Sequence, residues 1–137
     1  MFLVDTNVLS AMRREDRAEP QFRDWVRRTP PEDMYLSVLN LYEIEIGALR
    51  IARRDAVQGR ELDRWIRGLV LPVFADRILP VTPAIAMRCA ALNVPDPRPT
   101  IDSLLAATAL EHRLTVVTRN IADFAPMGVP ILNPWQA

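Results

Sequence analysis

Phe2-Leu3-Val4-Asp5-Thr6-Asn7 opens the chain, and its first three residues predict a short buried strand. Asp, Thr and Asn commonly begin helices, because their side-chain oxygens accept hydrogen bonds from the free N–H groups of the first turn. We therefore expect the strand to pass directly into a helix that runs to about Met12. This arrangement places the Asp5 carboxylate at the carboxyl end of a buried strand.

The rest of the chain continues this alternation of strands and helices. Short apolar or β-branched runs predict strands at residues 34–36, 78–81, 115–118 and 131–132. Apolar spacing and capping residues predict helices around residues 22–26, from Ser37 to about Arg54, from Glu61 to about Val70, from Pro83 to about Leu92, and from Ile101 to about His112 behind a Thr100 cap. We expect an α/β fold in a single domain spanning residues 1–137, with a parallel sheet covered by helices on both faces.

Composition excludes several kinds of chemistry. The 17 basic residues are all Arg and balance 17 acidic ones, so net charge gives no support for nucleic-acid binding. Without Lys, the chain has neither a phosphate-binding P-loop nor a Schiff base. One Cys and one His allow no internal disulfide and no Cys/His zinc site. No apolar run is long enough for a bilayer and no signal peptide is evident, so we expect a cytoplasmic protein without membrane contact.

Four acidic residues are placed differently from the others, which lie among polar neighbours. Asp5 and Asp123 follow predicted strands, and ligands bind beyond the carboxyl ends of strands in open parallel sheets. Asp102 lies in the first turn of an apolar helix, and Glu43 lies within the helix that follows Ser37. We expect the four carboxylates to share one acidic pocket.

Each of these residues also has an ordinary explanation. Asp5 can cap a helix, Asp102 can complement the helix dipole, and Asp123 can occupy a turn. Glu43 can face solvent, and helical periodicity does not choose between Glu43 and Glu45. The four positions together are more informative than any one of them.

Clustered carboxylates repel one another, so their pKa values rise unless a cation neutralises them. Oxygen ligands suit Mg²⁺ or Mn²⁺, and two such ions about 4 Å apart can clamp an in-line displacement at phosphorus. This chemistry needs no nucleophilic side chain. The acidic set therefore favours metal-dependent cleavage of a phosphodiester.

Five short motifs occur in a fixed order along the chain. They are Phe2–Asn7, Ser37 with Glu43 and Gly47, Asp102–Ala109 with Leu105 at a usual Ile position, Thr118–Asn120 with Asp123 and Phe124, and Asn133–Trp135. Together they resemble the motifs of the PIN-domain nucleases, and most closely those of bacterial toxins of the VapC and FitB type. The resemblance covers nearly the whole chain.

The resemblance implies a PIN-like three-layer α/β/α sandwich with a central, mostly parallel sheet of four to five strands. It implies a Mg²⁺- or Mn²⁺-dependent endoribonuclease that is the toxin of a type II toxin–antitoxin pair. A VapB-like antitoxin partner, an RNA substrate and usually a homodimer are implied as well.

The resemblance also assigns roles to residues. Catalysis and metal binding fall to Asp5, Glu43, Asp102 and Asp123, so Glu43 is selected over Glu45. Substrate contacts or support of these carboxylates fall to Thr6, Asn7, Thr118, Arg119 and Asn120. Asn120 competes with Asp123 as the fourth polar contact. Apart from the resemblance, Arg119 lies in the segment that leads to Asp123, so we expect it at the rim of the pocket, where it either contacts RNA phosphate or pairs with a surface carboxylate.

Three alternatives remain beside the ribonuclease. A non-catalytic PIN-fold module that binds nucleic acid would keep the fold without cleavage, and a DNA-acting nuclease would use the same site. A phosphoryl-accepting receiver domain needs an acidic pair after its first strand and a later Lys. Thr6 and Asn7 follow Asp5 here and Lys is absent, so the sequence disfavours that class.

Overall fold

The computed structural model describes residues 1–136, in which five parallel strands form one sheet. The strands are β1 Phe2–Val4, β2 Met34–Ser37, β3 Ile78–Leu79, β4 Thr115–Val117 and β5 Ile131–Leu132. They are ordered β3-β2-β1-β4-β5 across the sheet. The prediction of an α/β fold around a parallel sheet of four to five strands is confirmed.

The strand order reverses direction at β1. The chain builds β2 and β3 on one side of β1 and then crosses to place β4 on the other side. In the β1–β4 pair, Val4 lies opposite Val117, and the Asp5 N–H donates to the Val117 carbonyl at 2.9 Å. In open α/β sheets, ligands bind in the crevice outside the carboxyl ends of the strands at such a reversal, and the residues that follow β1 and β4 lie at this edge.

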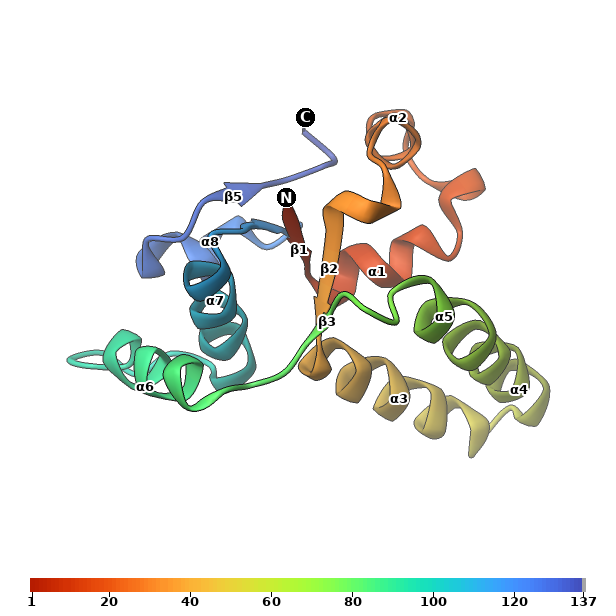
Figure 1. Ribbon diagram of the computed structural model, residues 1–137. Coiled ribbons are helices and arrows are strands. Elements are labelled where there is room, and N and C mark those ends of the chain that lie inside the picture. The colour runs from red at the N-terminus through yellow and green to blue at the C-terminus, as the bar shows by residue number, and fades with distance from the viewer. Residues whose placement is uncertain (137) are drawn as a thin grey trace.

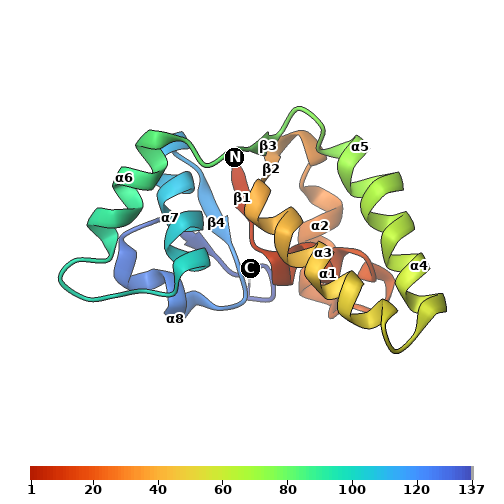
Figure 2. The ribbon, with the colours of Figure 1, turned by 90° about the horizontal axis from the view of Figure 1, so that it is seen from below.

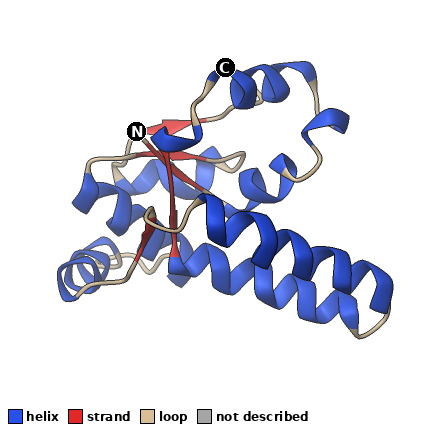
Figure 3. Ribbon diagram, turned by 45° about the vertical axis from the view of Figure 1, so that its right-hand side comes forward, coloured by secondary structure: helices blue, strands red, loops and turns tan. Residues whose placement is uncertain are grey.

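Helices cover both faces of the sheet (Figures 1 and 2). One side carries α1 Thr6–Met12, α2 Pro20–Arg28, α3 Val38–Ala52, α4 Ala56–Trp65 and α5 Leu71–Val73. The other carries α6 Pro83–Leu92, α7 Thr100–His112 and α8 Ile121–Phe124. Shorter helical segments are Glu15–Arg17, Pro31–Asp33, Ala125–Met127 and the π-helical turn Ile66–Val70. Helices thus make up most of the molecule around a small central sheet (Figure 3).

Alternate strand residues supply the two halves of the core. In β1, Leu3 packs with α7 and Val4 packs with α1 and α3. In β4, Val116 and Val117 divide in the same way. Because successive strand side chains point to opposite faces, the buried pattern of both strands fixes which residue ends each strand at the crevice.

Helix boundaries differ from the predictions in two places. The helix expected from Glu61 begins at Ala56, because Asp55 caps it by accepting from the Gln58 N–H at 3.1 Å. Thr100 was expected to cap the helix that begins at Ile101, but it is the first helical residue and Pro99 precedes it.

Three further details correct the sequence expectations. The third strand ends at Leu79, before Pro80, which has no N–H to donate to a neighbouring strand. In the segment predicted as a helix from Glu61 to about Val70 by its apolar spacing, apolar Leu69 is 53% exposed. Asp123 lies in the first turn of the short helix α8, so the alternative explanation that it occupies a loop turn does not hold. Among the described helices, none combines the length and apolar character needed to cross a bilayer.

Candidate active site

Asp5 is the most buried carboxylate of the candidate site, with 8% of its surface exposed. Its Oδ1 accepts from the Thr6 N–H at 2.8 Å, and its Oδ2 accepts from the hydroxyl of Thr118 at 2.8 Å and the side-chain amide of Asn7 at 3.3 Å. Burial raises the pKa of Asp5, these hydrogen bonds oppose the rise, and the charge of Asp123 adds to it. Asp5 therefore caps α1 and also presents a restrained carboxylate at the crevice.

Thr6 connects Glu43 to this carboxylate. The Thr6 hydroxyl donates to Glu43 Oε1 at 2.5 Å and accepts from the Asn40 side-chain amide at 3.1 Å. Glu45, two residues further along α3, instead pairs with Arg67. The structure thus places Glu43, and not Glu45, on the Asp5 side of α3.

Asp102 lies in the first turn of α7, within electrostatic reach of the other three carboxylates. Because α7 leads back into β4, its first turn lies at the carboxyl edge of the sheet. Burial raises the pKa of Asp102 to about 6, with further contributions from the charges of Asp5, Asp123 and Glu43. Within residues 1–136, no side-chain hydrogen bond stabilises its charged form. Asp102 is therefore close enough to the other three predicted carboxylates for their charges to affect it.

The loop after β4 is fastened to the start of α1. The Thr118 hydroxyl accepts from the Asn120 N–H at 3.0 Å while it donates to Asp5. The Arg119 N–H donates to Asn7 Oδ1 at 3.3 Å. Thr118, Asn7 and the backbone of this loop consequently hold the Asp5 side of the site.

The side chains of Arg119, Asn120 and Asp123 lie further out. The Arg119 guanidinium pairs with the Glu19 carboxylate at 3.3 Å. A pair with a surface carboxylate was one of the two alternatives predicted for this residue. Asn120 and Asp123 are both exposed, but only the charge of Asp123 raises the pKa of Asp5 and of Asp102. Asp123 therefore acts electrostatically with the acidic group; Asn120 carries no charge, so this effect does not choose between the two as the fourth polar contact.

Asn40 is the supporting residue that the sequence analysis missed. It is fully buried, and its side chain closes a capping box by accepting from the Ser37 N–H at 2.7 Å. The same amide donates to Thr6, which holds Glu43. The signal was present, because a polar residue three positions after a Ser cap marks such a box.

The donor set suits a hard divalent cation, but the side chains do not converge on one point. All four groups are carboxylates, and the pKa of Asp102 is raised first by burial and then by the neighbouring negative charges, both of which a bound cation would offset. Within residues 1–136, no three Asp, Glu, His or Cys side chains are close enough together to hold one metal ion. The chemistry therefore fits a metal, and side-chain rotation would have to complete its coordination.

The family model described as "PIN domain" matches residues 2–126. The chain belongs to the PIN-domain family. It is 34% identical to plasmid stability protein StbB of Pseudomonas syringae pv. tomato, with all of both chains covered. It is 32% identical to toxin FitB of Neisseria gonorrhoeae and 31% identical to VapC ribonuclease Y4jK of Sinorhizobium fredii, with 99% of each chain covered in both comparisons.

Solved PIN-domain structures show the same architecture. FitAcB from Neisseria gonorrhoeae superposes with a TM-score of 0.91 at 30% identity, covering 100% of both chains. A toxin–antitoxin complex from Klebsiella pneumoniae superposes with a TM-score of 0.69 at 27% identity, covering 98% of both chains. The resemblance to toxins of the VapC and FitB type is confirmed.

The raised pKa of Asp102 predicts a pH-dependent stability in the absence of divalent metal. The folded protein retains a proton on Asp102 up to about pH 6, whereas the unfolded chain loses it near 3.8. The resulting stabilisation is complete below the unfolded pKa and is lost as pH rises through the folded value. We expect the free energy of unfolding of the wild type to fall relative to that of Asp102→Asn across this range.

Urea denaturation in chelator from about pH 4 to about pH 8 measures this difference. Above pH 6, Asp102→Asn should be the more stable protein, because it lacks a charge that burial and the neighbouring carboxylates disfavour. A constant difference between the two proteins over the whole range would contradict the electrostatic description of the site.

Proposed function

We propose that this PIN domain is a Mg²⁺- or Mn²⁺-dependent endoribonuclease and the toxin of a type II toxin–antitoxin pair. The observation that carries the proposal is the position of Asp102, whose pKa responds to the charges of Asp5, Glu43 and Asp123 at the sheet edge where the strand order reverses. The similarity to toxin FitB and to VapC ribonuclease Y4jK supports the biological role and the nuclease class.

Each carboxylate has a role that follows from its surroundings. Asp5 and Asp102 are the proposed primary metal ligands. Asp5 is buried at the crevice, and among residues 1–136 no side chain donates a hydrogen bond to the charged form of Asp102. Glu43 and Asp123 would complete the set from α3 and α8. When bound, the metal would supply positive charge beside the scissile phosphate.

The hydrogen-bonded residues around these ligands orient them. Thr6 holds Glu43, while Thr118 and Asn7 hold Asp5. Such supporting contacts fix the direction of a ligand's lone pairs before the metal arrives. They also restrain the carboxylates against the mutual repulsion that burial strengthens.

Substitution of the carboxylates tests the nuclease proposal. We expect Asp5→Asn, Asp102→Asn and Glu43→Gln each to lower metal-dependent RNA cleavage by roughly a hundredfold or more, because each removes a ligand charge. Cleavage of a labelled RNA by purified protein, with and without Mg²⁺ or Mn²⁺, is the measurement.

Glu45→Gln is the matched control for Glu43→Gln, because it makes the same chemical change on the same helix outside the acidic group. It should cleave RNA like the wild type. Equal loss in both variants, or full activity in Asp5→Asn, would refute the assignment. Cleavage of single-stranded DNA in preference to RNA would identify a DNA-acting nuclease instead.

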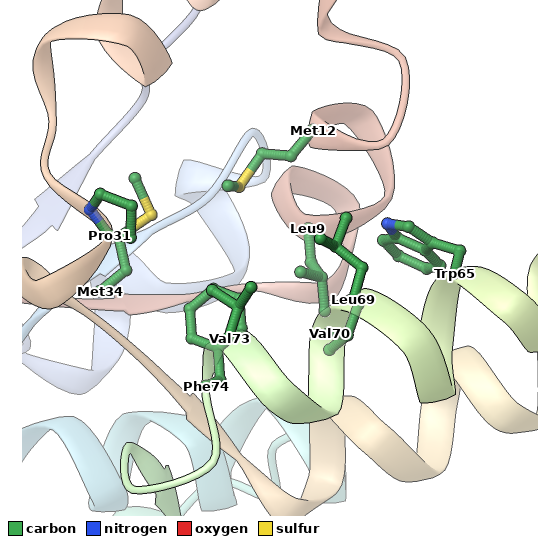
Figure 4. Close-up of a pocket in the computed structure, with 9 residues that line it drawn as sticks. All are labelled: Leu9, Met12, Pro31, Met34, Trp65, Leu69, Val70, Val73 and Phe74. Carbon is green, nitrogen blue, oxygen red and sulfur yellow. The ribbon is translucent and has the colours of Figure 1, made fainter.

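An apolar cavity of about 170 Å³ lies beside α1 and fits a partner side chain (Figure 4). It is lined by Leu9, Met12, Pro31, Met34, Trp65, Leu69, Val70, Val73 and Phe74. Leu69 and Val73 are 53% and 39% exposed at its edge, so apolar surface remains uncovered there. An open apolar cavity of this kind can bury an anchoring residue of a binding partner.

We infer that an antitoxin segment occupies this cavity and continues along α1 towards the carboxylates. Helix α1 contributes Leu9 to the cavity and Thr6 to the acidic site, so one extended segment can reach both. A basic side chain at its end would neutralise the carboxylates in place of metal. The similarity to the Klebsiella pneumoniae toxin–antitoxin complex supports such a partner.

Val73→Glu tests this docking site. A carboxylate there would be buried against apolar groups of the partner, so we expect antitoxin affinity to fall about fivefold or more. The control is Val57→Glu, on α4, where valine is 59% exposed and does not line the cavity. Equal affinities of the two variants for the cognate antitoxin, measured by calorimetry, would exclude the cavity as the docking site.

A homodimer and a cytoplasmic location stay predictions. Helix α6 offers a surface that suits self-association, because apolar Met87 is 75% exposed on it. The exposed face of α6 also carries four small apolar residues, Ala84, Ala86, Ala90 and Ala91. Arg88 is the one charged residue of this helix. An apolar outward face of this kind favours contact with another protein surface.

A further inference from the structure

The Arg119 side chain, which follows the Thr118 that contacts Asp5, stacks on a pair of aromatic rings. The rings of Phe22 and Trp135 are parallel to within 16°, with centroids 4.4 Å apart. The central guanidinium carbon of Arg119 lies 4.6 Å from the centre of the Trp135 ring. Phe22 is fully buried and Trp135 is 9% exposed, so the stack is rooted in the core. Figure 1 shows how the segment after β5 reaches towards α2, which carries Phe22.

The backbone fixes the other end of Arg119. Its N–H donates to Asn7, and its neighbour Thr118 donates to Asp5. The guanidinium is therefore anchored by the loop on one side and by the aromatic ring on the other. Stacking on an aromatic face leaves the N–H edge of a guanidinium available for an anion.

Glu19 is a weak occupant of that edge. It contacts Arg119 Nη2 at 3.3 Å, which is longer than the roughly 2.7–2.9 Å of a good charge-assisted bond. The two side chains are 63% and 55% exposed, and exposed ion pairs contribute little stability. Arg67, by contrast, is paired with both Glu45 of α3 and Asp63 of α4, so its guanidinium links two helices.

We propose that Arg119 is a phosphate-binding residue for the RNA backbone, oriented by Trp135 and covered by Glu19 in the free protein. The inference rests on the proposed ribonuclease function and adds a substrate contact outside the carboxylates. A phosphate matches the guanidinium fork and releases counterions when it binds, so it displaces one exposed carboxylate readily. A neutral protein thereby obtains local positive charge where its substrate lies.

RNA binding by the inactive Asp102→Asn protein tests this subsite. The probe is a mixed-sequence single-stranded RNA oligonucleotide, and the readout is fluorescence anisotropy over a salt series. Arg119→Ala should weaken binding and lower the salt slope by roughly one unit. Glu19→Gln should strengthen binding about two- to fivefold, the range spanned by an exposed ion pair.

Glu111→Gln is the matched control, because Glu111 is another surface carboxylate paired with an Arg, Arg88, at 3.2 Å. Glu111→Gln should leave RNA affinity unchanged. When Glu19→Gln is combined with Arg119→Ala, it should change RNA affinity no more than this control does. The phosphate subsite alone would be overturned by two results together. Glu19→Gln would have the same RNA affinity as Glu111→Gln, and Arg119→Ala would leave the salt slope of RNA binding unchanged. No RNA binding by Asp102→Asn would overturn the proposed substrate and the subsite with it.

Discussion

The pairing of β1 with β4 is the constraint on which the acidic site depends. Val4 lies opposite Val117, so the residues that follow them, Asp5 and Thr118, meet at the crevice and are hydrogen bonded. A slip of one residue would exchange the buried faces of the strand and separate this pair. The same apolar alternation that fills both halves of the core therefore positions the most buried carboxylate of the site.

The acidic group is unfavourable for folding and is held by its surroundings. Burial raises the pKa of both Asp5 and Asp102, which means that water would favour their charged forms more than the protein does. Hydrogen bonds from Thr6, Thr118 and Asn7 offset this for Asp5. Asp102 has no such compensation within the described residues, so it would gain most from a cation.

Sequence predicted the features that depend on local pattern. The position of Asp5 followed from a buried strand that leads into a helix cap. The choice of Glu43 over Glu45 did not follow from periodicity, because it depends on contacts with Thr6 and Arg67, which lie far away in sequence.

The features that sequence did not predict depend on such distant contacts or on weak local signals. The start of α4 was missed because exposed Val57 and a glycine give no apolar stripe there. The stack beneath Arg119 forms only when the C-terminal segment reaches α2.

Calorimetric titration with Mn²⁺ in buffers of different ionisation enthalpy tests most directly whether the four carboxylates form a cation site. With the pKa of Asp102 near 6, Mn²⁺ binding should release a substantial fraction of a proton at about pH 6 and almost none at about pH 8. Absence of Mn²⁺ binding, or equal proton release at both pH values, would contradict the proposal that the four carboxylates form a cation site.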